Sequence, residues 1–226
     1  MLLYKYLEYE HAISSISKNR IKVSTIDSLN DPYEMLPCVI DTDGTFLPSE
    51  RCREVFKSII GNHHGFVCLS ETLTDPVMWA HYAAKHTGVA FEFEIPDNEP
   101  MIQVKYKNRR VRIHVSDVKK NGSAERQAFN DLLRRKFKGW SYEQEYRDTV
   151  PLSQTFLADG LRFRPIPKDN FRRVILGLDC PLKENAVQSL LGTSGFHNVG
   201  IARAKLSDTG FKMFIRKVPA RRSPKI

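Results

Sequence analysis

The strongest constraint on the fold is an alternating run of apolar and polar residues at 89–95, Val-Ala-Phe-Glu-Phe-Glu-Ile. Successive side chains of a β-strand point to opposite faces of its sheet. Val89, Phe91, Phe93 and Ile95 therefore share one face, and Glu92 shares the other with Ala90 and Glu94. The run predicts a strand with its apolar face against the core.

Shorter runs of the same kind predict that strands outnumber helices. We expect strands over residues 2–7, 20–25, 65–70, 102–106, 140–150, 161–166, 172–178, 199–206 and 211–218. We expect helices over residues 9–19, 50–60, 77–86, 123–138 and 181–191. The short gap after residue 95 favours antiparallel pairing of the strands at 89–95 and 102–106. Without a repeat or a linker, these elements predict one mixed α+β domain over residues 1–218, followed by a basic tail at 219–226.

Two helix starts and one helix face can be assigned to particular residues. Asp75-Pro76 combines a capping side chain with a proline at the first turn, and Ser49 is expected to cap the helix at 50–60. Trp79 is expected in the core. The helix at 123–138 is expected to pack through Ala124, Ala128, Leu132 or Leu133, and Phe137.

The charge balance favours polyanionic partners. The chain has 35 Lys and Arg against 26 Asp and Glu, which gives a net charge of +9. Nucleic acid, nucleotide phosphates or an acidic, antitoxin-like protein fit such a surface, although any one basic cluster is also typical of a solubilising face. The basic residues gather at 105–112, at 134–138 and at 216–225.

Other features favour a cytoplasmic protein that binds neither membrane nor metal. No run approaches the roughly 18 apolar residues of a membrane span, and the start Met1-Leu2-Leu3-Tyr4-Lys5 is too polar for a secretory signal. The four cysteines are scattered without zinc-site spacing, so four reduced thiols are expected.

The segment Trp140-Ser141-Tyr142-Glu143-Gln144-Glu145-Tyr146-Arg147 is the main candidate for chemistry. If it is extended, Glu143 and Glu145 point the same way, and two like charges on one face raise each other's pKa. Such a pair suits a site that handles a cation, a developing positive charge or a proton. In a helix the two would not face each other, and Arg147 could simply orient Glu145 through a salt bridge.

Three segments resemble those of a widespread bacterial family of unknown function: Leu-Asn-Asp-Pro-Tyr-Glu at 29–34, Met-Trp-Ala-His-Tyr-Ala at 78–83 and the segment at 140–147. The order of elements also resembles the ADP-ribosyltransferase fold. That resemblance implies two packed, mostly antiparallel sheets with flanking helices, and NAD as the substrate. It also implies a macromolecular acceptor, either nucleic acid or protein, and a role in antiviral defence or as a toxin.

The same resemblance implies roles for individual residues. Glu145 would stabilise the ribose cation that forms when nicotinamide leaves, and Glu143 would take the proton of the acceptor. The cofactor-binding residues would be Lys5 (where those enzymes carry His or Arg), Tyr4, Ser70, Tyr82 and Arg147. Tyr82 has a ring suited to stacking on nicotinamide.

Two other functions are consistent with the same residues. A non-catalytic basic module would bind nucleic acid by phosphate contacts and stacking, with Glu143 and Glu145 paired to nearby arginines. A metal-dependent nuclease would need Asp31, Glu34 and either Glu143 or Glu145 to converge on a divalent ion.

Overall fold

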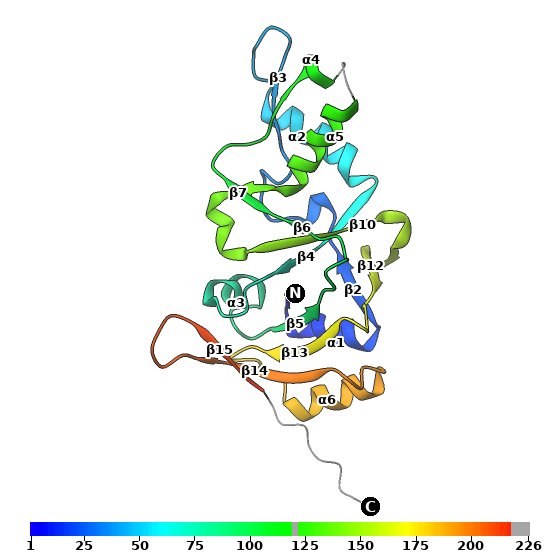
Figure 1. Cartoon of the computed structure of the whole chain (residues 1–226). Coiled ribbons are helices and arrows are strands. Elements are labelled where there is room, and N and C mark those ends of the chain that lie inside the picture. Colours follow the sequence, from blue (N-terminus) through cyan, green and yellow to red (C-terminus); the bar gives the residue numbers. More distant parts are fainter. Residues whose placement is uncertain (119–121, 218–226) are drawn as a thin grey trace, which may run out of the picture. The chain divides into compact units, whose positions relative to one another are not determined.

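The computed structural model describes residues 1–118 and 122–217 (Figure 1). The chain divides into two compact units. The first comprises Met1–Ile21, Leu69–Glu99 and the chain from Pro165 on, and the second comprises Lys22–Cys68 and Pro100–Arg164. Each unit is assembled from stretches that are far apart in sequence. A single domain over residues 1–218 stays a prediction, and the basic tail at 219–226 lies outside the described residues.

The first unit is built on a mixed sheet in the order β15-β14-β13-β5-β1, with the end of β4 beside β1. β13 and β14 are parallel and are connected through α6, whereas the other neighbouring strands of this unit are antiparallel. α1 lies next to α6, and α3 lies next to β1. The bounds are β1 Leu2–Leu7, α1 Tyr9–Ser17, β4 His64–Ser70, α3 Pro76–Tyr82, β5 Val89–Glu94, β13 Phe171–Leu176, α6 Glu184–Thr193, β14 Gly200–Leu206 and β15 Met213–Lys217.

β5 is the central strand of this sheet, and both of its faces are buried. Phe91 and Ala90, on opposite faces, are each fully buried. Glu92 is also buried, and Arg173 donates to it from Nε at 2.7 Å and from a terminal nitrogen at 2.5 Å. The strand at 89–95 is therefore confirmed. Its expected pairing with the strand at 102–106 is wrong, because β5 pairs with β1 and β13.

The second unit contains several short sheets and two longer helices. Its strands are arranged in the orders β4-β10-β6, β11-β12-β2, β3-β8 and β7-β9, and the last two pairs are parallel. Its apolar core includes Ile26, Met35, Ile60, Phe66 and Leu133. The bounds are β2 Arg20–Val23, η1 Ile26–Ser28, β3 Cys38–Ile40, α2 Ser49–Gly61, β6 Ile102–Gln103, β7 Lys105–Lys107, β8 Arg112–His114, α4 Val115–Val118, α5 Gly122–Arg134, β9 Arg135–Phe137, η2 Lys138–Glu143, β10 Glu145–Pro151, η3 Leu152–Gln154, β11 Phe156–Ala158 and β12 Leu161–Pro165.

Most helices begin near the expected residues but end earlier. The side chain of Asp75 accepts from the backbone N–H of Val77 at 2.8 Å, as the capping prediction requires. α3 ends at Tyr82 because the backbone turns left-handed from Ala84 to His86, with φ of 44°, 53° and 70°. Trp79 is fully buried, and its indole N–H donates to the Leu73 carbonyl at 2.8 Å, so its core position is confirmed.

Two local predictions are wrong. Pro48 is the N-cap of α2, and the Ser49 hydroxyl instead accepts a hydrogen bond from Arg110 at 3.1 Å. α5 ends at Arg134 and the chain continues as β9, so Phe137 is 54% exposed and does not join the apolar stripe of the helix. Leu132 and Leu133 are both buried, as expected.

The structure is thus mixed α+β and strand-rich, with a large mixed sheet, smaller sheets and helices. All four cysteines are free thiols. Among the described residues, none of the helices combines the length and the apolar character that crossing a membrane requires.

The Glu92–Arg173 pair gives a test of the first unit. Arg173→Met leaves a buried carboxylate without its guanidinium, and we expect the free energy of unfolding in urea to fall by about 3 kcal/mol. Arg172→Met is the matched control, since Arg172 pairs with Glu94 on the surface, with both side chains about half exposed. The free energy of unfolding of Arg172→Met should fall by less than about 1 kcal/mol. Equal losses in the two variants would contradict this account of β5.

Candidate functional site

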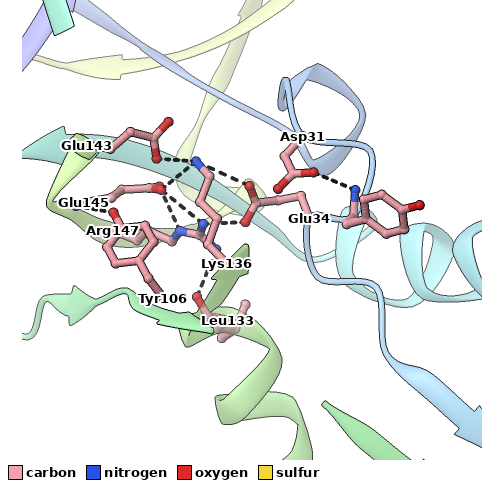
Figure 2. Close-up of polar contacts among 9 residues, drawn as sticks. Asp31, Glu34, Tyr106, Leu133, Lys136, Glu143, Glu145 and Arg147 are labelled. Carbon is pink, nitrogen blue, oxygen red and sulfur yellow. Dashed lines mark hydrogen bonds and ion pairs between the residues drawn. The ribbon is translucent and has the colours of Figure 1, made fainter. Parts of the chain in front are cut away.

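Five charged side chains of the second unit form a buried group that we call the carboxylate cluster. It consists of Glu34, Glu143, Glu145, Lys136 and Arg147 (Figure 2). All five residues are at most 7% exposed. Because an unpaired charge is very costly to bury, this arrangement depends on the contacts among the five groups.

Lys136 on β9 brings the three carboxylates together. Its ammonium nitrogen lies 2.5 Å from Glu143, 3.0 Å from Glu145 and 3.6 Å from Glu34. The same nitrogen lies 5.3 Å from the centre of the Trp140 ring, within range of a cation–π interaction. Glu34, Glu143 and Glu145, three of the four acids considered for a metal-dependent nuclease, therefore converge. The cation between them in this structure is the ammonium group of Lys136.

Arg147 on β10 satisfies the other side of the cluster. Its guanidinium donates to both oxygens of Glu145, at 2.8 and 3.2 Å, and also to Glu34. A further N–H donates to the Leu133 carbonyl at 2.9 Å. The salt-bridge alternative for Arg147 therefore describes its contacts in this structure.

Local backbone geometry brings Glu143 to the cluster by a route that the sequence did not indicate. Glu143 ends the 3-10 helix η2, and Gln144 follows in the left-handed region at φ 45° and ψ 53°. β10 begins at Glu145, where Glu145 and Arg147 share the buried face. The prediction of an extended segment at 143–145 is wrong, although the two carboxylates still meet at Lys136.

The segment at 29–34 supplies the third carboxylate. Asp31 is buried, and its Oδ1 accepts from the backbone N–H of Tyr33 at 2.9 Å. This turn leaves Tyr33 58% exposed and directs Glu34 into the cluster. Figure 2 shows Asp31 and Glu34 on the same loop, beside Lys136.

The cluster holds three carboxyl groups against two cations, so the carboxyls do not share the same electrostatics. Burial raises the pKa of Glu145, but the charges of Arg147 and Lys136 outweigh it and hold that pKa well below its usual range. Burial raises the pKa of Glu34, and the same two cations only partly offset it. Burial would lower the pKa of Lys136, but Glu145, Glu34 and Glu143 raise it instead. Glu34 therefore takes up a proton more readily than Glu145 does.

A pocket of about 280 Å³ lies in the same unit, and we call it the basic pocket. Besides Lys136, four cationic residues line it: Lys107, Arg109, Arg110 and Arg135. Its apolar residues are Met35, Leu36, Val111 and Leu132, all buried, and the exposed rings of Tyr33 and Phe137 also line it. Lys136 belongs to its wall as well, so the pocket adjoins the carboxylate cluster.

The parallel pairing of β7 and β9 explains how the pocket and the cluster are separated. Tyr106 is paired with Lys136, and Lys107 with Phe137. Since successive side chains point to opposite faces, Tyr106 and Lys136 face the cluster while Lys107 and Phe137 face away from it. The Tyr106 hydroxyl accepts from the backbone N–H of Glu145 at 2.8 Å, which agrees with this assignment.

The residues expected to act in catalysis or to bind NAD are divided between the units. Glu143, Glu145 and Arg147 are brought together in the second unit, whereas Lys5, Tyr4, Ser70 and Tyr82 belong to the first. Their assignment as a catalytic and NAD-binding set stays a prediction.

The four residues of the first unit have structural surroundings of their own. Tyr4 pairs with Ser70 across β1 and β4, and Lys5 pairs with Phe91 across β1 and β5. The Ser70 hydroxyl donates to the Thr72 carbonyl at 3.2 Å, and burial followed by the charge of Glu92 raises the pKa of Tyr4. Tyr82 ends α3, with its ring edge-on to His81.

Sequence reasoning missed several residues of this site. Lys107, Arg109, Arg135 and Lys136 were recognised only as members of basic clusters. Pairing of β7 with β9 then joins the two clusters around one pocket. The available signal was Phe137 among the cations of the second cluster, because stacking rings among cations are typical of nucleic-acid sites.

Two isosteric substitutions test the electrostatics of the carboxylate cluster. We expect Glu145→Gln to lower the free energy of unfolding at pH 7 by about 3–5 kcal/mol, because Arg147 and Lys136 lose their shared partner. Glu34→Gln should cost less, since the cluster has one carboxyl more than it has cations. Urea denaturation of both variants beside the wild type gives the comparison.

The stability lost in Glu145→Gln and the stability lost in Glu34→Gln should change with pH in opposite directions. The folded-state pKa of Glu145 is depressed, so its contribution is present above the unfolded value of about 4.3 and is lost as pH falls. The pKa of Glu34 is raised, so its contribution is present below about 4.3 and is lost as pH rises. The deficit of Glu145→Gln should therefore shrink in acid, and that of Glu34→Gln should shrink towards neutral pH. Parallel pH profiles would refute this assignment of the protons.

Comparison with known protein families finds a match over part of the chain. Residues 78–147 are similar to a family described as "Protein of unknown function (DUF2971)". No curated protein and no solved structure matches the chain. The matched range includes the segments at 78–83 and 140–147, but not the one at 29–34. The chain is therefore similar, from Met78 to Arg147, to a family whose function is not known.

Proposed function

We propose that this protein binds nucleic acid through the basic pocket of its second unit. The observation that carries the proposal is the combination of four cationic side chains and two exposed aromatic rings around one hollow. Cations bind the phosphate backbone, and aromatic rings stack on bases. A net charge of +9 adds a long-range attraction for the same kind of partner.

The cations at the rim are available to a ligand. Among the described side chains, no acid lies within ion-pairing distance of Lys107, Arg109 or Arg135. Lys107 and Arg109 are exposed. The acids in contact with Lys136, which also lines the pocket, are buried. Under this proposal the carboxylate cluster supports the pocket and takes no part in chemistry.

Salt dependence tests the proposal. Each cation that neutralises a phosphate contributes about 1 to the slope of log affinity against log salt concentration. Lys107→Ala/Arg109→Ala should therefore reduce the slope for a single-stranded RNA or DNA by about 2. Lys18→Ala/Lys212→Ala removes two cations of the first unit and should leave the slope nearly unchanged. Equal reductions would place the binding elsewhere than in the pocket.

A second candidate is an NAD-dependent ADP-ribosyltransferase that modifies a nucleic acid or protein acceptor. One observation favours it: Glu143 and Glu145 meet at Lys136, and Lys136 also lines the pocket. Two carboxylates beside a basic pocket could stabilise a ribose cation and deprotonate an acceptor. Glu145 would first have to leave its ion pairs with Arg147 and Lys136.

Labelled NAD distinguishes the second candidate from the first. The protein is incubated with labelled NAD and separate pools of RNA, DNA and protein, and the wild type is compared with Glu143→Gln and Glu145→Gln. Transfer by the wild type alone, with both variants shown to be folded by circular dichroism, would support the transferase. If the protein binds nucleic acid in a salt-dependent way but transfers no label, and the folded variants bind equally well, the result supports the non-catalytic binding module.

A further inference from the structure

We infer that the basic pocket receives one unpaired nucleotide of a single strand, with its base in the apolar hollow and its phosphates on the cationic rim. This inference rests on the proposed function and names the class of nucleic acid. Three properties of the pocket support it: its size, the division of its lining, and the positions of its aromatic rings.

The size of the pocket suits one nucleotide. Its volume of about 280 Å³ is at the lower limit of small-molecule sites, which hold roughly 300–1,000 Å³. Bases in a duplex are stacked and paired, so their faces are not available to a pocket unless the base is first extruded from the duplex, which costs free energy. An unpaired strand presents its bases without that cost.

The lining of the pocket divides into an apolar part and a charged part. Met35, Leu36, Val111 and Leu132 are at most 7% exposed. Met35 and Leu36 also belong to apolar clusters of the second unit. Lys107 and Arg109, by contrast, are exposed. A base with two stacking faces, attached to a charged phosphate, has the same division, so one nucleotide satisfies both parts at once.

The aromatic rings are held in place before a ligand binds. Asp31 fixes the backbone of Tyr33 through its N–H, and Arg110 lies 5.7 Å from the centre of the Tyr33 ring. Arg110 is itself bonded to Ser49 at 3.1 Å. The backbone of Phe137 is fixed by the pairing of β9 with β7. Rings ordered in advance lose little entropy on stacking, which favours recognition of a base.

The experiment compares an intact single strand with a strand of the same length whose bases are removed but whose phosphates remain. Binding to the full chain is followed by fluorescence anisotropy. Stacking on aromatic residues is worth about 1–3 kcal/mol per base, or roughly 5- to 150-fold in affinity. We expect the wild type to prefer the intact strand by that factor, and to bind a duplex of the same sequence more weakly than the single strand.

The aromatic variant provides the decisive comparison. Tyr33→Ala/Phe137→Ala removes two exposed rings, so it should fold, and it should bind intact and abasic strands equally. Phe46→Ala is the matched control, because Phe46 is 62% exposed in the same unit but does not line the pocket. That control should keep the preference of the wild type for bases.

Each outcome separates the inference from the proposed function. If intact and abasic strands bind the wild type equally, and Lys107→Ala/Arg109→Ala weakens both, the pocket binds phosphates only and the inference fails alone. A preference for the duplex also overturns the inference while nucleic-acid binding stands. If a free nucleoside monophosphate competes for the pocket as well as an unlabelled strand does, the ligand is a small nucleotide and not a strand. That result overturns the inference. If no nucleic acid binds, the proposed function fails as well.

Discussion

The ion pairs of Arg147 and Lys136 with three buried carboxylates are the interaction on which the second unit depends. They connect the loop before β3, strand β9, the 3-10 helix η2 and strand β10. Arg147 and Glu34 are 113 residues apart in sequence, so the cluster fixes contacts that no local preference could specify. A half-satisfied cluster would be worse than an apolar core, because each unpaired charge keeps its full desolvation cost. The arrangement therefore favours one packing of these elements over alternatives.

The same contacts determine what the basic pocket presents to solvent. Lys136 points to the carboxylates, so strand alternation turns its neighbours Arg135 and Phe137 the other way. Glu34 is drawn into the cluster, and Tyr33 beside it is left exposed at the pocket. Opposite charges are thus sorted by burial: the acids are enclosed with two cations, and the remaining cations line the hollow. The positive character of the pocket follows from this sorting more than from the net charge of the chain.

Local signals predicted much of the fold, and the sequence pattern named four of the five residues of the carboxylate cluster, Glu34, Glu143, Glu145 and Arg147. They did not predict the basic pocket. Alternation identified β5, and the capping residue before Pro76 identified the start of α3, because both signals act over a few residues. Pairing partners were not predictable in that way. The gap between residues 95 and 102 suggested a hairpin, but β5 pairs with β1 and β13 instead. The parallel pair β7–β9 joins two basic clusters whose proximity no spacing rule indicates. The left-handed Gln144 was missed because a single residue carries that turn.

The free energy needed to release Glu145 from its ion pairs distinguishes a catalytic role of the site from a binding role. A carboxylate that is to stabilise a ribose cation must be accessible to it, and must interact more strongly with the transition state than with the ground state. Glu145 is buried, with a depressed pKa and direct bonds to Arg147 and Lys136. Releasing it would leave two buried cations short of a partner, at a cost of about 3–5 kcal/mol. A polyanionic ligand could offset that cost only by replacing the carboxylate at both cations. Catalysis by Glu145 therefore requires rearrangement of the cluster, whereas binding in the pocket uses the side chains where they already lie.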